Sequence, residues 1–64
     1  MNTFDAVDAL EKGYRISRIN WKRKYFYLRN DNLYLFQFGT IYYVGKYKNI
    51  NFNYRIFDWQ VLYE

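Results

Sequence analysis

The sequence predicts a small α+β domain, in which one N-terminal helix packs on an antiparallel sheet of about five strands. Apolar residues recur at helical spacing only before Gly13, and beyond it apolar and aromatic side chains alternate as they do in strands. Clusters of Gly, Asn and Asp separate the alternating stretches, which is typical of hairpins. The chain has 64 residues and no linker, so we expect a single domain over residues 1–64.

The helix is predicted over residues 3–12. Asn2 or Thr3 can supply the N-cap, and Gly13 suits the left-handed position that ends many helices. The side chains expected to face the sheet are Phe4, Val7 and Leu10.

Five later stretches alternate and are predicted as strands: residues 14–19, 24–30, 33–38, 41–44 and 55–63. The turn formers between them are residues 30–32 and the pair Gly39–Thr40. Residues 45–53 are polar and are predicted as a loop that could contain a short strand.

Several predicted strands carry bulky apolar side chains on both faces. In the third strand Tyr34, Phe36 and Phe38 alternate with Leu33 and Leu35. In the last strand one face is predicted to carry Phe57, Trp59, Val61 and Tyr63, and the other Ile56 and Leu62. Because a single helix covers only one face of a sheet, we expect another subunit to cover the second face, in a dimer or a tetramer.

Composition limits the kind of partner. The net charge of +4 favours an anionic partner, and 27% of the residues are aromatic. The chain has no Cys and no His, which excludes disulfides and the common zinc and haem ligand sets, and no cofactor is predicted. Its apolar runs are too short to span a membrane, and its start does not resemble a signal peptide. We therefore expect a cytoplasmic protein with no membrane partner.

Side chains suited to catalysis are scarce. Three of the six acids, Asp5, Asp8 and Glu11, are expected on the solvent side of the helix. Ser17 is the only serine, and no His can activate it. The sequence therefore predicts a binding protein and not an enzyme.

Residues 18–26 interleave cations with aromatic rings, which suits a ligand that carries both a phosphate and a base. In this interpretation Trp21 supplies a stacking face between Arg18 and the cations at 22–24. The alternative is that Trp21 is a core or interface ring and that the cations form a solvated turn.

Asp58 and Trp59 form a second candidate pair. A carboxylate beside a large ring could accept hydrogen bonds from ribose hydroxyls or from an adenine amine. Alternatively, Trp59 packs inward and Asp58 pairs with a nearby arginine.

Two resemblances follow from these residues. Residues 21–36 resemble the first hairpin of pleckstrin-homology domains, but the chain is too short for the remaining strands and the C-terminal helix of that family. Residues 4–21 and Asp58–Leu62 resemble the two ends of a phage and prophage family, which opens with Phe, an Ala-Leu helix, Lys-Gly and Arg-x-x-Trp and closes with Asp-Trp. That family includes the second type of Thoeris anti-defence protein, a sponge for immune signalling nucleotides.

The second resemblance implies a homo-oligomer, commonly a tetramer, that holds cyclic ADP-ribose signals uncleaved in pockets between subunits. It identifies Trp21 with the base-stacking ring and Arg18 with a phosphate or framework group. Asp58 and Trp59 match the family's C-terminal pair, and Asn53 stands where an Asp is common. The predicted ligand-binding residues are Arg18, Trp21, Arg23, Asn53, Asp58 and Trp59.

The function that we expect is an anti-defence sponge in the host bacterial cytoplasm, which binds a signal of the glycocyclic ADP-ribose type. Some members of the family also hold cyclic oligonucleotides. Nucleic acid is not the partner that we expect. One alternative is a direct protein inhibitor of a bacterial defence effector such as a CRISPR nuclease, to which some relatives are assigned. Another is a small module that binds phosphoinositide or nucleic acid.

Overall fold

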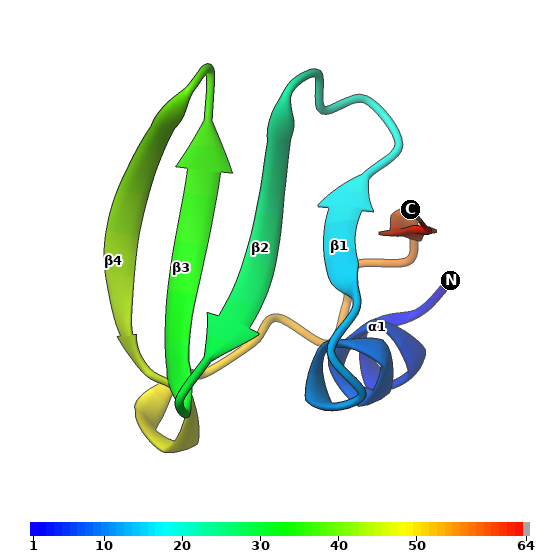
Figure 1. Cartoon of the computed structure of the whole chain (residues 1–64). Helices are drawn as coiled ribbons and strands as arrows, with labels where there is room; N and C mark the ends of the chain where they lie inside the picture. Colours follow the sequence, from blue (N-terminus) through cyan, green and yellow to red (C-terminus); the bar gives the residue numbers. More distant parts are fainter. Residues whose placement is uncertain (64) are drawn as a thin grey trace.

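The computed structural model describes residues 1–63 and confirms the predicted fold class, with one helix packed on a five-stranded antiparallel sheet (Figure 1). The sheet order is β4-β3-β2-β1-β5. The elements are α1 (Thr3–Glu11), β1 (Arg15–Arg18), β2 (Lys24–Arg29), β3 (Asn32–Gln37), β4 (Thr40–Lys46), the 3-10 helix η1 (Tyr47–Asn49) and β5 (Trp59–Leu62). None of the described helices is long and apolar enough to cross a membrane.

Asn2 caps the start of helix α1, because its side-chain oxygen accepts a hydrogen bond of 2.8 Å from the Asp5 backbone N–H. The prediction that Phe4 faces the sheet is wrong, because Phe4 is 70% exposed and packs on the Tyr54 ring, with 4.5 Å between ring centroids. Val7 is half-buried. The buried side of α1 consists of Thr3, Ala6, Ala9 and Leu10. Small alanines on this side let the helix backbone lie close to the sheet.

Two tight hairpins join β2 to β3 and β3 to β4. Asn30 and Asp31 both have positive φ, at 51° and 62°, as a type I′ turn requires. In the second hairpin Phe38 (φ 49°) and Gly39 (φ 85°) hold these positions, and Gln37 pairs with Thr40. The predicted Gly39–Thr40 turn is therefore wrong by one residue.

The C-terminal strand is shorter than the prediction of 55–63, which is wrong at its start. Ladder pairing with β1 begins at Trp59, and before it the Asn53 side chain accepts a hydrogen bond from the Arg55 N–H at 3.0 Å, which turns the backbone. Phe57 and Tyr63 are 71% and 73% exposed, so neither shares the buried face of Trp59. The predicted loop also begins later, because β4 extends to Lys46.

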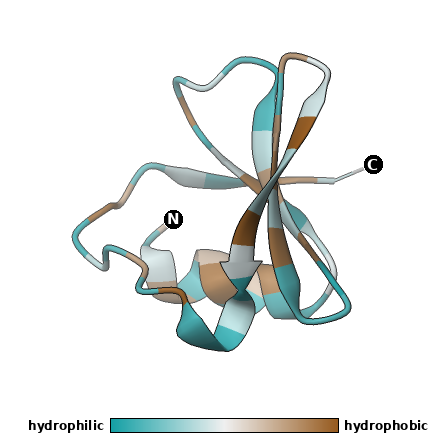
Figure 2. Ribbon diagram, turned by 90° about the vertical axis from the view of Figure 1, so that its left-hand side faces the viewer, coloured by the Kyte–Doolittle hydropathy of each residue, from teal (hydrophilic) through white to brown (hydrophobic). Residues whose placement is uncertain are grey.

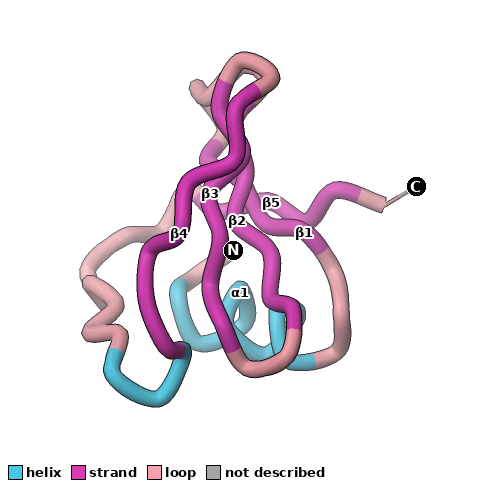
Figure 3. The backbone as a smooth tube through the Cα atoms, turned by 60° about the vertical axis from the view of Figure 1, so that its left-hand side comes forward, coloured by secondary structure: helices cyan, strands magenta, loops and turns pink. Residues whose placement is uncertain are grey.

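The core lies between α1 and the sheet face toward it. Its buried apolar residues are Ala6, Ala9, Leu10, Ile16, Leu33 and Trp59. Side chains from the long connection after η1 pack against this core, including Ile50, Phe52 and Ile56. In Figures 2 and 3 the end of the sheet that carries the β3–β4 turn extends well beyond the helix, so α1 covers only part of the sheet.

The opposite sheet face carries a set of aromatic side chains that we call the tyrosine face. It comprises Tyr25, Tyr27, Tyr34, Phe36, Ile41 and Tyr43, which are direct cross-strand neighbours along β2, β3 and β4. The alternate residues Phe26, Leu28 and Leu33 point the other way and contribute to the core. The predicted second apolar face therefore exists, and among residues 1–63 no helix packs on it.

Candidate functional site

An ion pair joins the end of β1 to the start of β5. The Arg18 guanidinium donates to both carboxylate oxygens of Asp58, with Nε–Oδ1 at 2.8 Å and Nη2–Oδ2 at 3.1 Å. This hydrogen bonding lowers the pKa of Asp58. The two side chains are 32% and 37% exposed, so the pair lies at the surface within reach of a ligand.

Trp21 follows Arg18 by three residues, and its backbone N–H donates to the Arg18 carbonyl oxygen at 2.9 Å. The indole is half-buried and packs edge-on against Phe26 and Trp59, with 5.6 and 5.8 Å between ring centroids. The Lys24 ammonium lies 4.4 Å from the centroid of the same ring. Trp21 thus combines features of both interpretations, since it supports the core and also holds a cation over its ring.

Trp59 is a core ring, only 5% exposed. Its indole N–H donates to the Thr3 hydroxyl at 3.0 Å, and that hydroxyl lies 2.8 Å from the Asn53 carbonyl oxygen and 3.1 Å from that of Ile56. Two hydrogen bonds join the Trp59 backbone to Met1. The Met1 amino group donates to the Trp59 carbonyl oxygen, and the Trp59 backbone N–H donates to the Met1 carbonyl oxygen. The part of Trp59 in any ligand site is therefore to hold its neighbours in position.

Among residues 1–63, the side chains of the remaining two predicted site residues, Arg23 and Asn53, make no hydrogen bond or ion pair with Arg18, Trp21 or Asp58. Asn53 supports the fold, because its side-chain oxygen accepts a hydrogen bond from the Arg55 backbone N–H and its carbonyl oxygen accepts one from the Thr3 hydroxyl. Arg23 has a positive φ of 53°, is exposed, and accepts a hydrogen bond of 3.0 Å from the Phe38 N–H at the tip of the β3–β4 hairpin. The residues that the structure brings together are Arg18, Trp21, Lys24, Asp58 and Trp59, which we call the basic aromatic corner.

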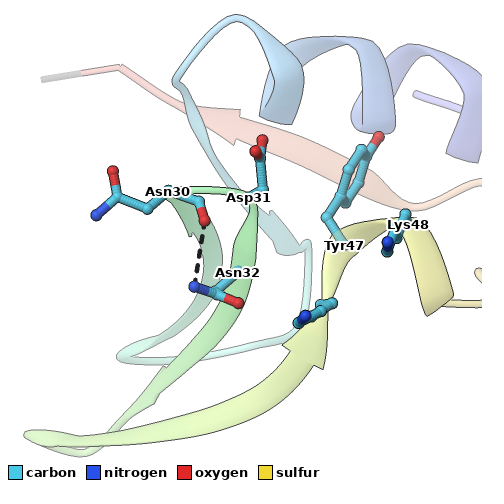
Figure 4. A pocket seen from close by; sticks show the side chains of 6 residues that line it. Asn30, Asp31, Asn32, Tyr47 and Lys48 are labelled. Carbon is cyan, nitrogen blue, oxygen red and sulfur yellow. Dashed lines mark hydrogen bonds between the residues drawn. The ribbon is translucent and has the colours of Figure 1, made fainter.

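A separate polar depression of about 450 Å³ lies at the β2–β3 turn, away from the corner. Figure 4 shows the turn residues Asn30 to Asn32 on one side and Tyr47 and Lys48 on the other. The Tyr47 hydroxyl donates to the Glu11 carboxylate at 2.5 Å, and burial together with this bond raises the pKa of Tyr47. Sequence reasoning missed this depression because its lining comes from two segments that read only as turn and loop.

Two further sequence features went unrecognised. The sequence marks Lys24 only as one of three cations, because its position over Trp21 depends on the path of the loop before β2. It marks Thr3 only as a candidate helix cap, and no sequence signal indicates its bond to Trp59.

The corner offers a partly exposed ring, two cations and one carboxylate within a small surface. Guanidinium and ammonium groups bind phosphate oxygens, and a carboxylate accepts hydrogen bonds from hydroxyl or amino groups. Among the described residues no group of three acidic side chains converges as metal ligands would. No family model, curated protein or solved structure matches the chain.

Proposed function

We propose that the protein is an anti-defence sponge that binds a signalling nucleotide of the cyclic ADP-ribose type and sequesters it without cleavage. The observation that carries the proposal is the Lys24 ammonium over the Trp21 ring beside the Arg18–Asp58 pair. These groups match the two parts of a nucleotide, a flat base and a charged phosphate. The proposal also rests on the resemblance of residues 4–21 and Asp58–Leu62 to the sponge family.

Binding would proceed by exchange of partners at Trp21. A base stacks on the ring face that Lys24 now occupies, and the displaced ammonium then pairs with a phosphate oxygen. Arg18 uses its Nε and one Nη2 hydrogen for Asp58, so its other N–H donors can reach a second phosphate oxygen. The Asp58 carboxylate, which has further lone pairs, can accept a hydrogen bond from a ribose hydroxyl.

Sequestration without cleavage fits the acid-base character of the corner. Asp58 is the acid of this cluster, and the pairing with Arg18 lowers its pKa, so it is ionised at neutral pH and has no proton to donate to a leaving group. The chain has no His that could donate a proton instead.

The test combines calorimetry with recovery of the ligand. Cyclic ADP-ribose titrated into the protein should bind, and heat denaturation should release it with unchanged mass. A linear product would mean that the protein is an enzyme, and absence of binding to cyclic ADP-ribose and its glycocyclic isomers would contradict the proposal.

Two variants connect binding to the corner. Lys24→Gln should weaken cyclic ADP-ribose binding by about tenfold, because it removes one phosphate contact. Lys22→Gln is the matched control, since this exposed lysine lies two residues away, and it should change affinity little.

Trp21→Ala should cost on the order of 1–3 kcal/mol of binding if a base stacks there. Because Trp21 also packs on Phe26 and Trp59, the melting temperature of Trp21→Ala should be measured to separate a loss of binding from a loss of stability. Trp21→Phe, which keeps a ring at this position, is the variant to compare it with.

A further inference from the structure

We infer that the tyrosine face binds a proline-rich segment of another protein, with a proline ring between the rows of aromatic rings and an acidic side chain at the cations next to them. The surface shares no residue with the basic aromatic corner. The inference therefore goes beyond the proposed function and does not depend on its ligand.

Three rows of side chains cross β2, β3 and β4 on this side of the sheet. The first two rows form the tyrosine face, and direct cross-strand pairing gives Tyr25, Phe36 and Ile41 in one and Tyr27, Tyr34 and Tyr43 in the other. The third row, at the end nearer the β2–β3 turn, pairs Arg29 with Asn32 and Asn32 with Lys46. Because alternate residues of a strand share a face, this polar row continues the tyrosine face.

The aromatic rings stand upright on the sheet. Tyr25 and Phe36 are stacked, with 4.8 Å between ring centroids and 17° between planes. Tyr27 and Tyr34 are stacked at 5.4 Å and 19°. Stacked pairs on adjacent strands cover each other's flat faces, so they present their edges outward. A nucleobase needs an open flat face on which to stack, and this geometry therefore disfavours nucleic acid.

Upright rings suit a proline-rich segment, because a polyproline II helix binds in grooves lined by aromatic side chains. Between the two aromatic rows lies a notch of about 230 Å³, lined by Arg15, Tyr25, Tyr27, Phe36 and Ile41. A proline ring can enter this notch and pack against the ring edges. A polyproline II helix has no internal hydrogen bonds, so its carbonyl oxygens can accept hydrogen bonds from the tyrosine hydroxyls beside the notch.

The charge of this side of the sheet favours an acidic partner. The five strands contain cations but no acid. Arg29 and Lys46 are exposed and make no ion pair within residues 1–63. In Figure 4 the Asp31 side chain of the adjoining turn points toward the side of α1, whereas Asn32 points away from it.

The same charges argue against a second copy of the chain as the occupant. A two-fold interface pairs one patch with itself, so the cations of the third row would find no acid across it. An acidic segment instead brings the opposite charge to Arg29 and Lys46, which is the complementarity that selects a partner.

The distance between the notch and the cations predicts the spacing of the two groups in the partner. The notch is level with Phe26, midway between Tyr25 and Tyr27, and Arg29 follows three residues later. Three residues of an antiparallel strand span about 10 Å, close to the roughly 9.3 Å of one three-residue turn of polyproline II. Side chains one turn apart point the same way, so we expect a proline and a glutamate or aspartate three residues apart.

Calorimetric titration with a probe peptide and three variants of it, all with blocked ends, tests this spacing. The probe is Pro-Pro-Pro-Pro-Pro-Pro-Glu. Replacing its glutamate by glutamine should weaken binding about two- to fivefold, as for a surface ion pair. Replacing the proline three residues before the glutamate by alanine should weaken it about fivefold, because buried apolar area is lost. The matched peptide with alanine two residues before the glutamate should bind like the probe.

Two protein variants of equal net charge locate the peptide on the face. Ile41 and Tyr42 are neighbours on the edge strand β4, 58% and 50% exposed, and they lie on opposite faces of the sheet. Ile41→Glu puts a charge in the notch and should weaken binding of the probe about tenfold or more. Tyr42→Glu should bind the probe as the native protein does.

Absence of binding of the probe would overturn the inference, and so would equal binding of all four peptides. If the native chain is an oligomer and Tyr43, 59% exposed in one chain, becomes protected from hydroxyl radicals as that oligomer forms, the face belongs to a second copy instead. Tight binding of single-stranded DNA that Ile41→Glu abolishes and Tyr42→Glu does not would assign the face to nucleic acid.

Discussion

At the scale of single residues, Thr3 connects three parts of the chain through one hydroxyl group. The hydroxyl accepts a hydrogen bond from the Trp59 indole and lies within hydrogen-bond distance of the Asn53 and Ile56 carbonyl oxygens, and Thr3 is 1% exposed. It thereby fixes the start of α1, the connection before β5 and the ring on which Trp21 packs. A polar group at this depth is stabilising only while all its partners are present.

Thr3→Val tests this connection, because valine has nearly the same shape and lacks the hydroxyl. The Trp59 N–H and the facing carbonyl oxygens would lose their partner, and we expect a loss of about 1–3 kcal/mol in the free energy of unfolding. Thr3→Ser keeps the hydroxyl and should lose less. Urea unfolding of the three proteins measures the difference, and equal stability of Thr3→Val and the native chain would contradict the role assigned to Thr3.

The ion pair between Asp58 and Arg18 should make the stability of the fold depend on pH. Hydrogen bonds from Arg18 lower its pKa in the folded chain below the ordinary value of 3.8. The contribution of the pair to stability is therefore present above about pH 4 and is lost as the pH falls through the lowered pKa. The melting temperature of the native chain should exceed that of Asp58→Asn at pH 6, and the difference should shrink below pH 3.8. A difference that is constant from pH 6 to pH 2 would show that the charge of Asp58 does not matter.

At the scale of elements, the alternation of apolar residues was enough to predict one helix and five strands. The errors arose where local geometry departs from residue preference. Phe38 occupies a left-handed turn position that preference assigns to Gly or Asn, which displaced the predicted turn by one residue. In α1 the large Phe4 was assigned to the core by hydrophobicity, whereas the close approach of helix and sheet selects small side chains such as Ala6.

Gly45 shows how an element can depend on one backbone position. It lies in β4 beside an irregularity in the pairing with β3, has a φ of 153°, and pairs with the buried Leu33. A Cβ at this position would lie 3.4 Å from the Ile50 side chain. The sequence alone shows only a glycine at the end of a strand, where it reads as the start of a loop.

Gly45→Ala should therefore destabilise the chain by on the order of 1–3 kcal/mol, because an alanine at a φ of 153° strains the backbone, while its Cβ would meet the Ile50 side chain only at contact distance. Gly13→Ala is the control, since Gly13 also has a positive φ, of 95°, but a Cβ there meets no atom within 4 Å. The loss in Gly13→Ala should be the smaller one in thermal unfolding. The opposite order would show that the backbone conformation of Gly45 tolerates a side chain better than that of Gly13 does.

At the scale of the whole molecule, the candidate site was predictable in part. The sequence pointed to Arg18, Trp21, Asp58 and Trp59, and these four residues lie together because β1 and β5 are neighbours in the sheet. Arg23 was predicted because it belongs to the same basic segment as Trp21, and Asn53 because of the family resemblance. The positions of both residues depend on the course of loops, which residue types do not determine.

The stability of the fold should depend on the protein concentration if the chain self-associates. If a second copy covers the tyrosine face, association stabilises the folded state by mass action, and the melting temperature must rise with protein concentration. For a domain of this size, a hundredfold increase from 1 to 100 µM should raise it by roughly 5 °C or more. Tyr43→Lys should melt at a lower temperature that hardly changes with concentration, because a charge on the face prevents association. The loss of the native Tyr43 ring should itself cost little within one chain, since that ring is exposed. A native melting temperature that stays constant over this range would mean that the chain folds as a monomer, without a second copy on its tyrosine face.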